Sequence, residues 1–159
     1  PTIALLSDRE ESGAIKIAVP EQGSTETVTV DVSFHGSRQS LAVPTKISTR
    51  ERISQVYVHS RILETAFPYR YKTVLVAGNE TNAVYPRGAV RSVENMGLKE
   101  TLVPGTIALY QKYISAIDGL YYLDPPKRYL DGSQSGLPHI GTVGELLTED
   151  LAGHLLPPK

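Results

Sequence analysis

The segment TETVTVDVSF constrains the fold most, because its apolar and polar side chains alternate along its length. Val28, Val30, Val32 and Phe34 are separated by Thr, Asp and Ser, which is the two-residue period of a strand with one buried and one wet face. The flanking triplets QGS and HGS supply residues typical of turns. We therefore expect a strand here, with Val30 and Phe34 in the main core.

Further short runs of β-branched or aromatic residues predict more strands on both sides of this segment. They are AIKIAV, SLAVP, YKTVLVA, NAVYP, GAVRSVE, TIALYQKYI and LYYLD. Most of the connections between them are too short for a crossover helix, which parallel pairing requires. The fold class predicted is therefore mostly β, an antiparallel β-sandwich or open barrel with one or two short helices and an extended C-terminal arm.

Two segments interrupt the strand pattern. In residues 47–67, Ser48 and Glu51 have the spacing of a capping box, but the following QVYV is rich in strand formers, so helix and strand both remain open. Near the C-terminus, Thr142 and Glu145 repeat the capping-box spacing, and leucines follow at positions 147, 151 and 155. This pattern predicts a short C-terminal helix.

The composition also suggests a boundary near residue 124. The segment DPPKRYLDGSQSGLPHIG is poor in apolar residues and rich in Pro, Gly and Ser, as linkers and arms are. We predict a β-rich domain over residues 1–124, and a polar arm with a short C-terminal helix over residues 125–159. Such an arm could lie on a neighbouring copy of the chain.

Charge is unevenly distributed although the net charge is only −1. Residues 1–37 carry 2 basic and 6 acidic groups, residues 38–99 carry 10 and 4, and residues 100–159 carry 4 and 7, which gives −4, +6 and −3. The basic middle could meet a phosphate backbone or the acidic blocks of a neighbouring copy. No apolar run approaches the ~18 residues that span a bilayer, so a soluble chain without a membrane partner is expected.

The sequence lacks the common catalytic motifs. It has no phosphate-binding loop, dinucleotide fingerprint, HExxH zinc pair or GxSxG elbow, and its lack of cysteine excludes thiol chemistry. Its four histidines, His35, His59, His139 and His154, are far apart in the sequence. No catalytic residue, metal or cofactor is therefore predicted, although folding could still bring two histidines together.

The segment PYRYK is the best candidate for an interaction surface. In a strand, its two tyrosines would lie on one face and its Arg and Lys on the other. The chain has 9 Tyr but only 2 Phe and no Trp, and Tyr and Arg are enriched in protein interfaces. The predicted interface residues are Tyr69, Arg70, Tyr71, Lys72, Arg87, Tyr121 and Tyr122.

These observations together favour a non-enzymatic structural or assembly subunit of a larger homo- or hetero-oligomeric particle. In general style the chain resembles structural proteins of phage virions and tails and subunits of extracellular filaments, which implies a virion or extracellular location. Its partners would be other copies of itself and other assembly proteins. A small nucleic-acid-binding β-barrel is the alternative, and an enzyme whose site forms only in three dimensions is the third possibility.

Overall fold

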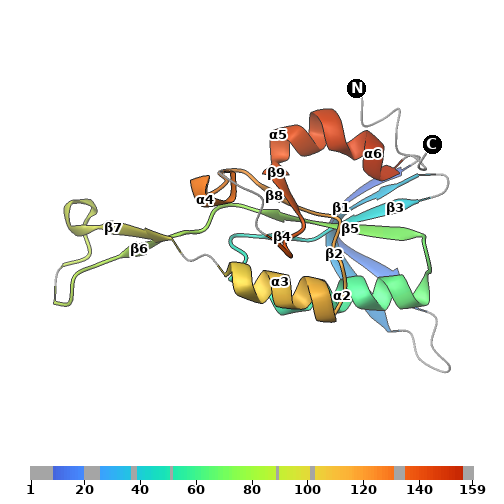
Figure 1. Ribbon diagram of the computed structural model, residues 1–159, viewed down its shortest axis with the longest axis horizontal. Coiled ribbons are helices and arrows are strands. Elements are labelled where there is room, and N and C mark those ends of the chain that lie inside the picture. Colours follow the sequence, from blue (N-terminus) through green and yellow to red (C-terminus); the bar gives the residue numbers. More distant parts are fainter. Residues whose placement is uncertain are drawn as a thin grey trace.

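The computed structural model describes residues 9–19, 26–36, 39–50, 52–88, 90–100, 103–130 and 135–155. Its centre is a seven-stranded mixed sheet with the order β1-β2-β3-β5-β8-β9, in which β4 also pairs with β5. Helices α2 and α3 lie on one side of this sheet and the C-terminal helical segment on the other, while the hairpin β6–β7 projects away from the body (Figure 1).

The first half of the sheet is an antiparallel meander, and the second half is parallel. The meander consists of β1 (Arg9–Ala18), β2 (Thr27–His35) and β3 (Ser40–Val43). The parallel part consists of β3 with β4 (Thr45–Lys46), β5 (Tyr71–Ala77), β8 (Gly119–Tyr122) and β9 (His139–Thr142). The remaining elements are α2 (Ile53–Ala66), β6 (Thr81–Val84), η1 (Val93–Asn95), β7 (Gly97–Glu100), α3 (Pro104–Tyr113), α4 (Lys127–Leu130), α5 (Val143–Glu145), η2 (Leu146–Asp150) and α6 (Leu151–Leu155).

The strand predicted from TETVTVDVSF is confirmed as β2. Val28, Val30 and Phe34 are buried, at 2%, 3% and 7% exposure, so the predicted burial of Val30 and Phe34 is confirmed. They do not share one core, because Val30 packs in the cluster that contains Leu63 and Phe34 in the cluster that contains Leu146. β1 carries a bulge opposite this strand, because Ser12 pairs with Val32 but Ile15 pairs with Val30. Such a bulge increases the local twist of the strand pair.

The predicted antiparallel sandwich or barrel is wrong, because β3, β5, β8 and β9 run parallel in one mixed α/β sheet. The segment left open as helix or strand forms α2, which supplies the crossover between β3 and β5. Its buried residues Ile53, Val56, Tyr57, Ser60 and Leu63 follow helical spacing. Burial of this one face outweighs the strand preference of QVYV.

Two other predicted strands are also wrong. TIALYQKYI lies in α3, which begins with Pro104 and buries Ile107 against the core. Proline is favoured in the first turn of a helix because its missing N–H would be unpaired there in any case. GAVRSVE ends within the short 3-10 helix η1, and its described residues form no strand.

The predicted C-terminal helix is confirmed, including its capping box, in which Thr142 Oγ1 accepts a hydrogen bond from the Glu145 N–H over 3.1 Å. The following residues form a π-helical turn, η2, before α6. Leu146 and Leu151, five residues apart, are therefore the buried pair, whereas Leu147 is 40% exposed. The other capping box, Ser48 with Glu51, does not begin α2: its N-cap is Arg52, without a side-chain hydrogen bond, and Glu51 lies outside the described residues.

The boundary at residue 124 stays a prediction. Within the segment that follows it, β9 joins the central sheet beside β8, pairing His139 with Gly119 and Thr142 with Tyr122.

Gly119 offers a test of the packing at the start of β8. A Cβ added there would lie 2.5 Å from Cε2 of the fully buried Tyr121 ring, so the ring would have to move. We expect Gly119→Ala to lower the free energy of unfolding by about 1–3 kcal/mol, the usual cost of overpacking, measured by urea denaturation. Gly105→Ala in α3 is the control, because nothing lies within 4 Å of its added Cβ. Equal stability of the two variants would contradict this packing.

Candidate functional site

A carboxylate and an ammonium group meet where β2 and β4 lie next to each other at one edge of the sheet. The main-chain N–H of Thr45 donates to Asp31 Oδ2 over 2.6 Å, and Lys46 Nζ lies 3.9 Å from the same oxygen. The Lys46 side chain is 22% exposed and that of Asp31 46% exposed. Asp31 is thus held by the backbone and faces solvent beside a partly buried cation.

The segment after Lys46 adds more positive charge to this edge. Arg50 and Arg52 are both exposed, immediately before α2. Arg52 has a φ of 52°, the left-handed conformation, which is uncommon for a residue other than glycine. Strained backbone of this kind is concentrated at binding and catalytic sites.

His59 lies on α2 near the same pair. Burial lowers the pKa of His59, the nearby positive charge of Lys46 lowers that pKa further, and a hydrogen bond with the main chain of Thr29 opposes both. The imidazole is therefore expected to be neutral at pH 7, when it can accept as well as donate a hydrogen bond.

A second polar region occupies the opposite end of the parallel strands. Lys46 pairs with Ala77 at the end of β5, whereas Lys72 is near its start. Ala77 is five positions after Lys72 in the same strand, which is about 16 Å at ~3.3 Å per residue. The two regions therefore lie at opposite ends of the parallel strands.

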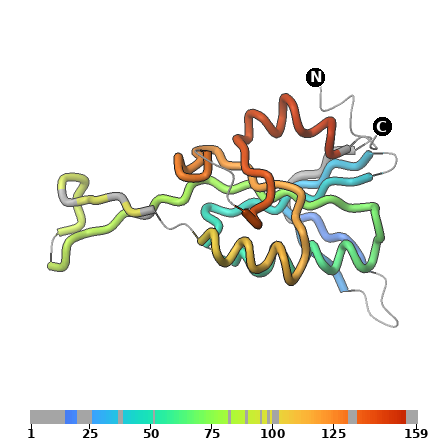
Figure 2. The backbone as a smooth tube through the Cα atoms, viewed as in Figure 1, coloured from blue at the N-terminus to red at the C-terminus, as the bar shows by residue number. Residues whose placement is uncertain are grey.

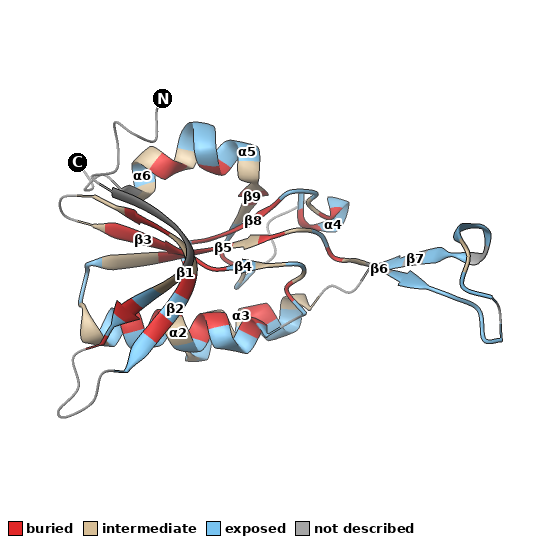
Figure 3. Cartoon of the chain, turned by 180° about the vertical axis from the view of Figure 1, so that it is seen from behind, coloured by how far each residue is buried: buried red, intermediate tan, exposed pale blue. Residues whose placement is uncertain are grey.

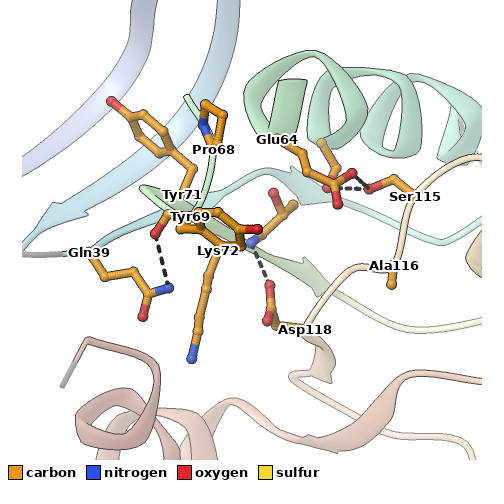
Figure 4. A pocket seen from close by; sticks show the side chains of 11 residues that line it. Gln39, Glu64, Pro68, Tyr69, Tyr71, Lys72, Ser115, Ala116 and Asp118 are labelled. Carbon is orange, nitrogen blue, oxygen red and sulfur yellow. Dashed lines mark hydrogen bonds between the residues drawn. The ribbon is translucent and has the colours of Figure 1, made fainter. Parts of the chain in front are cut away.

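An open pocket of about 340 Å³ marks this second region, between the end of α2, the start of β5 and the loop before β8. Figure 4 shows Lys72 and Asp118 in it, with Gln39 Nε2 donating to the carbonyl oxygen of Tyr69 over 3.4 Å. Thr73 N donates to Asp118 Oδ2 over 2.9 Å. Burial raises the pKa of Asp118, although this hydrogen bond and Lys72 both oppose the rise.

Two of the scattered histidines come together beside this region. Tyr121 Oη lies 3.1 Å from Asp150 Oδ2 and 3.0 Å from His154 Nε2, and His139 Nε2 lies 3.5 Å from Asp150 Oδ2. Burial of Tyr121 raises the pKa of its phenol, and Asp150 raises it further. Within the part of the chain that the structure describes, no group of three or more His, Cys, Asp or Glu side chains could hold a metal ion. These contacts attach the C-terminal helical segment to the sheet.

The predicted interface residues do not lie on one surface. Tyr121 and Tyr122 are fully buried within the chain. Tyr69 is 93% exposed just before β5, with a φ of 63°, and Arg70 and Arg87 are exposed. Tyr71 and Lys72 are half-buried. An interface role stays a prediction for the exposed members.

The fold relates the chain to known enzymes. It is similar to the type IIP restriction endonuclease Kpn2I, with 28% sequence identity and a TM-score of 0.64 over 86% of this chain and 48% of that one. It is also similar to the restriction endonuclease PspGI in a complex with substrate DNA, with 14% identity and a TM-score of 0.60 over 97% of this chain and 57% of that one. The chain thus spans about half the length of each enzyme. No protein-family model matches the sequence, and no curated protein matches it.

These similarities correct the prediction of function. The prediction of a non-enzymatic structural subunit of a virion, phage tail or filament is wrong, because the two solved structures described above, which are similar to this chain, are restriction endonucleases. The expectation that the chain is not an enzyme is wrong for the same reason. The alternative of a nucleic-acid-binding protein agrees better with them, although the sheet is not a barrel. Among the described residues, no helix is long and apolar enough to cross a membrane.

Asp31 and Lys46 were not among the interaction residues predicted from the sequence. Asp31 was predicted only as a polar position in an alternating strand, and Thr45, which contacts it, lies 14 positions later in the sequence. The sequence signal that could have identified them is Asp31 inside one predicted strand, together with three basic residues just after the next predicted strand, SLAVP. These are Lys46, Arg50 and Arg52.

His154 provides a test of the second region through pH. Burial lowers the pKa of His154, while Asp118 and Asp150 raise it and Lys72 and His139 lower it, for a net fall from 6.5. The unfolded chain therefore binds more protons, so this contribution to stability is present above pH 6.5 and is lost as the pH falls below 6.5 and through the lowered pKa of the folded protein. We expect His154→Gln to reduce the loss of unfolding free energy between about pH 7.5 and about pH 5.5, measured by urea denaturation. A loss as large as that of the unchanged protein would contradict this assignment.

Proposed function

We propose that this chain is a DNA-binding domain that cleaves phosphodiester bonds, with Asp31 and Lys46 as its active-site residues. The contact between these two side chains at the edge of the sheet is the observation that carries the proposal. The fold shared with two restriction endonucleases, one of them bound to substrate DNA, supports it. Double-stranded DNA is accordingly the substrate class proposed.

The two side chains would have different roles in such a reaction. Hydrolysis of a phosphodiester adds negative charge to the phosphoryl oxygens in the transition state, and a fixed cation stabilises that charge. Lys46 can supply the cation, because its ammonium group is partly buried and held beside Asp31. Asp31 can orient an attacking water molecule, because Thr45 N–H fixes its carboxylate.

Asp31 also fits a divalent cation whose remaining ligands come from the substrate. Mg²⁺ at phosphate-processing sites is commonly held by one or two carboxylates together with phosphate oxygens and water. Thr45 N–H and Lys46 Nζ both contact Asp31 through Oδ2, so its Oδ1 could act as such a ligand. When bound, the cation would supply additional positive charge to the phosphoryl group and a more acidic water.

Arg50 and Arg52 are proposed to contact the DNA bases or phosphates next to the cleaved bond. Arginine can bind guanine through two hydrogen bonds in the major groove, and it also neutralises phosphates. Both residues are exposed and follow Lys46 within six positions of the sequence. The strained backbone of Arg52 suits a side chain that must point in a fixed direction.

The test compares Asp31→Asn and Lys46→Met with the unchanged chain on long double-stranded DNA of mixed sequence, with Mg²⁺ and with a chelator. We expect each substitution to slow cleavage by at least about 100-fold, as the loss of a group that stabilises transition-state charge does. Melting temperature should change little, and binding to duplex DNA should persist. The controls are Glu149→Gln and Lys112→Met, which alter exposed charges on other elements.

Three outcomes are decisive. Unchanged cleavage by both site variants would exclude Asp31 and Lys46 as the site. Duplex binding without cleavage by the unchanged chain would leave only the DNA-binding part of the proposal. Absence of duplex binding at low salt would contradict the proposal altogether.

A further inference from the structure

The hairpin formed by β6 and β7 is an arm whose described side chains are not buried in the core. Its strands pair only with each other, from Thr81 with Glu100 to Val84 with Gly97. Figure 2 shows it extending from the body, and in Figure 3 most of its ribbon is coloured as exposed. Each of its described side chains, from Thr81 to Lys99, is exposed or half-buried. Packing of these side chains into the core therefore does not account for the arm. A two-stranded hairpin alone is also at best marginally stable in water.

The base of the arm is attached to the segment that follows Lys46. Glu80, at 1% exposure, lies just before β6, and its Oε1 accepts hydrogen bonds from Thr49 N over 2.8 Å and from Tyr122 Oη over 2.9 Å. Gly78 N also donates to the carbonyl oxygen of Lys46 over 3.0 Å. The arm is therefore fixed relative to Lys46 by buried and main-chain hydrogen bonds.

The exposed cations of the arm continue the positive charge at this edge. Arg87 and Arg91 lie in the loop between the strands, and Lys99 lies on β7. The guanidinium carbon of Arg91 is 5.8 Å from the centre of the Tyr85 ring, which directs this side chain. With Lys46, Arg50 and Arg52, these residues make up six of the ten basic groups in the basic middle of the chain.

We propose that this arm contacts duplex DNA beside the cleaved bond, through the phosphates that Arg87 and Arg91 reach from its loop. The inference rests on the proposed function, because it assigns a further DNA-contacting surface to that site. A two-stranded antiparallel ribbon is narrow enough to enter the major groove. The arm adds affinity and does not take part in the chemistry at Asp31 and Lys46.

The exposed apolar side chains of the arm favour a different occupant, a second copy of the chain. Val90 and Val93 are 77% and 84% exposed. Charge decides for DNA, because Arg87, Arg91 and Lys99 outnumber Glu94 and Glu100 on the arm, and because its base is fixed to the Lys46 segment.

The test measures affinity of the full chain for short fluorescent duplexes at several salt concentrations. The double variant Arg87→Gln, Arg91→Gln is compared with Arg61→Gln, Lys112→Gln, whose cations lie on α2 and α3. We expect the arm variant to lose roughly 10- to 100-fold in affinity near 0.1 M salt, and its salt slope to fall by about 1.8, since each phosphate contact contributes ~0.9. Its cleavage rate at saturating DNA should be unchanged, and the control should bind as the unchanged chain does.

The contrary outcomes are distinguishable. If the arm variant binds duplex DNA with unchanged affinity and slope while Asp31→Asn abolishes cleavage, the arm proposal fails and the proposed function stands. If Val90→Asp, Val93→Asp halves the mass in sedimentation and duplex affinity is unchanged in both arm variants, the arm contacts a second copy instead. If the unchanged chain binds no duplex at low salt, the arm proposal and the proposed function both fail.

Discussion

Parallel pairing on both sides of β5 is the constraint on which the site depends. β5 pairs with β3 and β4 on one side and with β8 on the other, all in the same direction. Parallel strands cannot be joined by a tight turn, so α2 must return the chain from β4 to β5 and α3 must precede β8. The carboxyl ends of these strands consequently meet at one edge, where ligands commonly bind in open α/β sheets.

That edge gathers groups from distant parts of the sequence. Asp31 comes from the antiparallel meander, Lys46 from the short strand β4, and the arm from the chain that leaves β5. Glu80 and Gly78 bind the main chain next to Lys46, so the cation and the base of the arm form one hydrogen-bonded unit. The opposite edge holds Lys72, Asp118 and the two histidines near Tyr121, which fasten the C-terminal helical segment.

Local patterns in the sequence predicted the elements better than their arrangement. The alternation around Val30 predicted β2 and the burial of Val28 and Val30, and the Thr142 capping box predicted the C-terminal helix, because both depend on neighbours within a few residues. The strand predicted at TIALYQKYI was wrong because Ile107 and its helical neighbours bury one face of α3 against the core. Strand direction was wrong because segment 47–67 fitted both helix and strand, and only its helical form permits a parallel crossover.

The sequence by itself determined where hydrophobic faces lie, the concentration of positive charge in residues 38–99, and the absence of thiol chemistry. Only the tertiary structure decided which charges meet. Asp31 and Lys46 are 15 positions apart, and their contact requires the meander to pair β2 with β3 and the chain to continue into β4. No spacing rule encodes that contact, because it is set by strand register between segments and not by the period of either one.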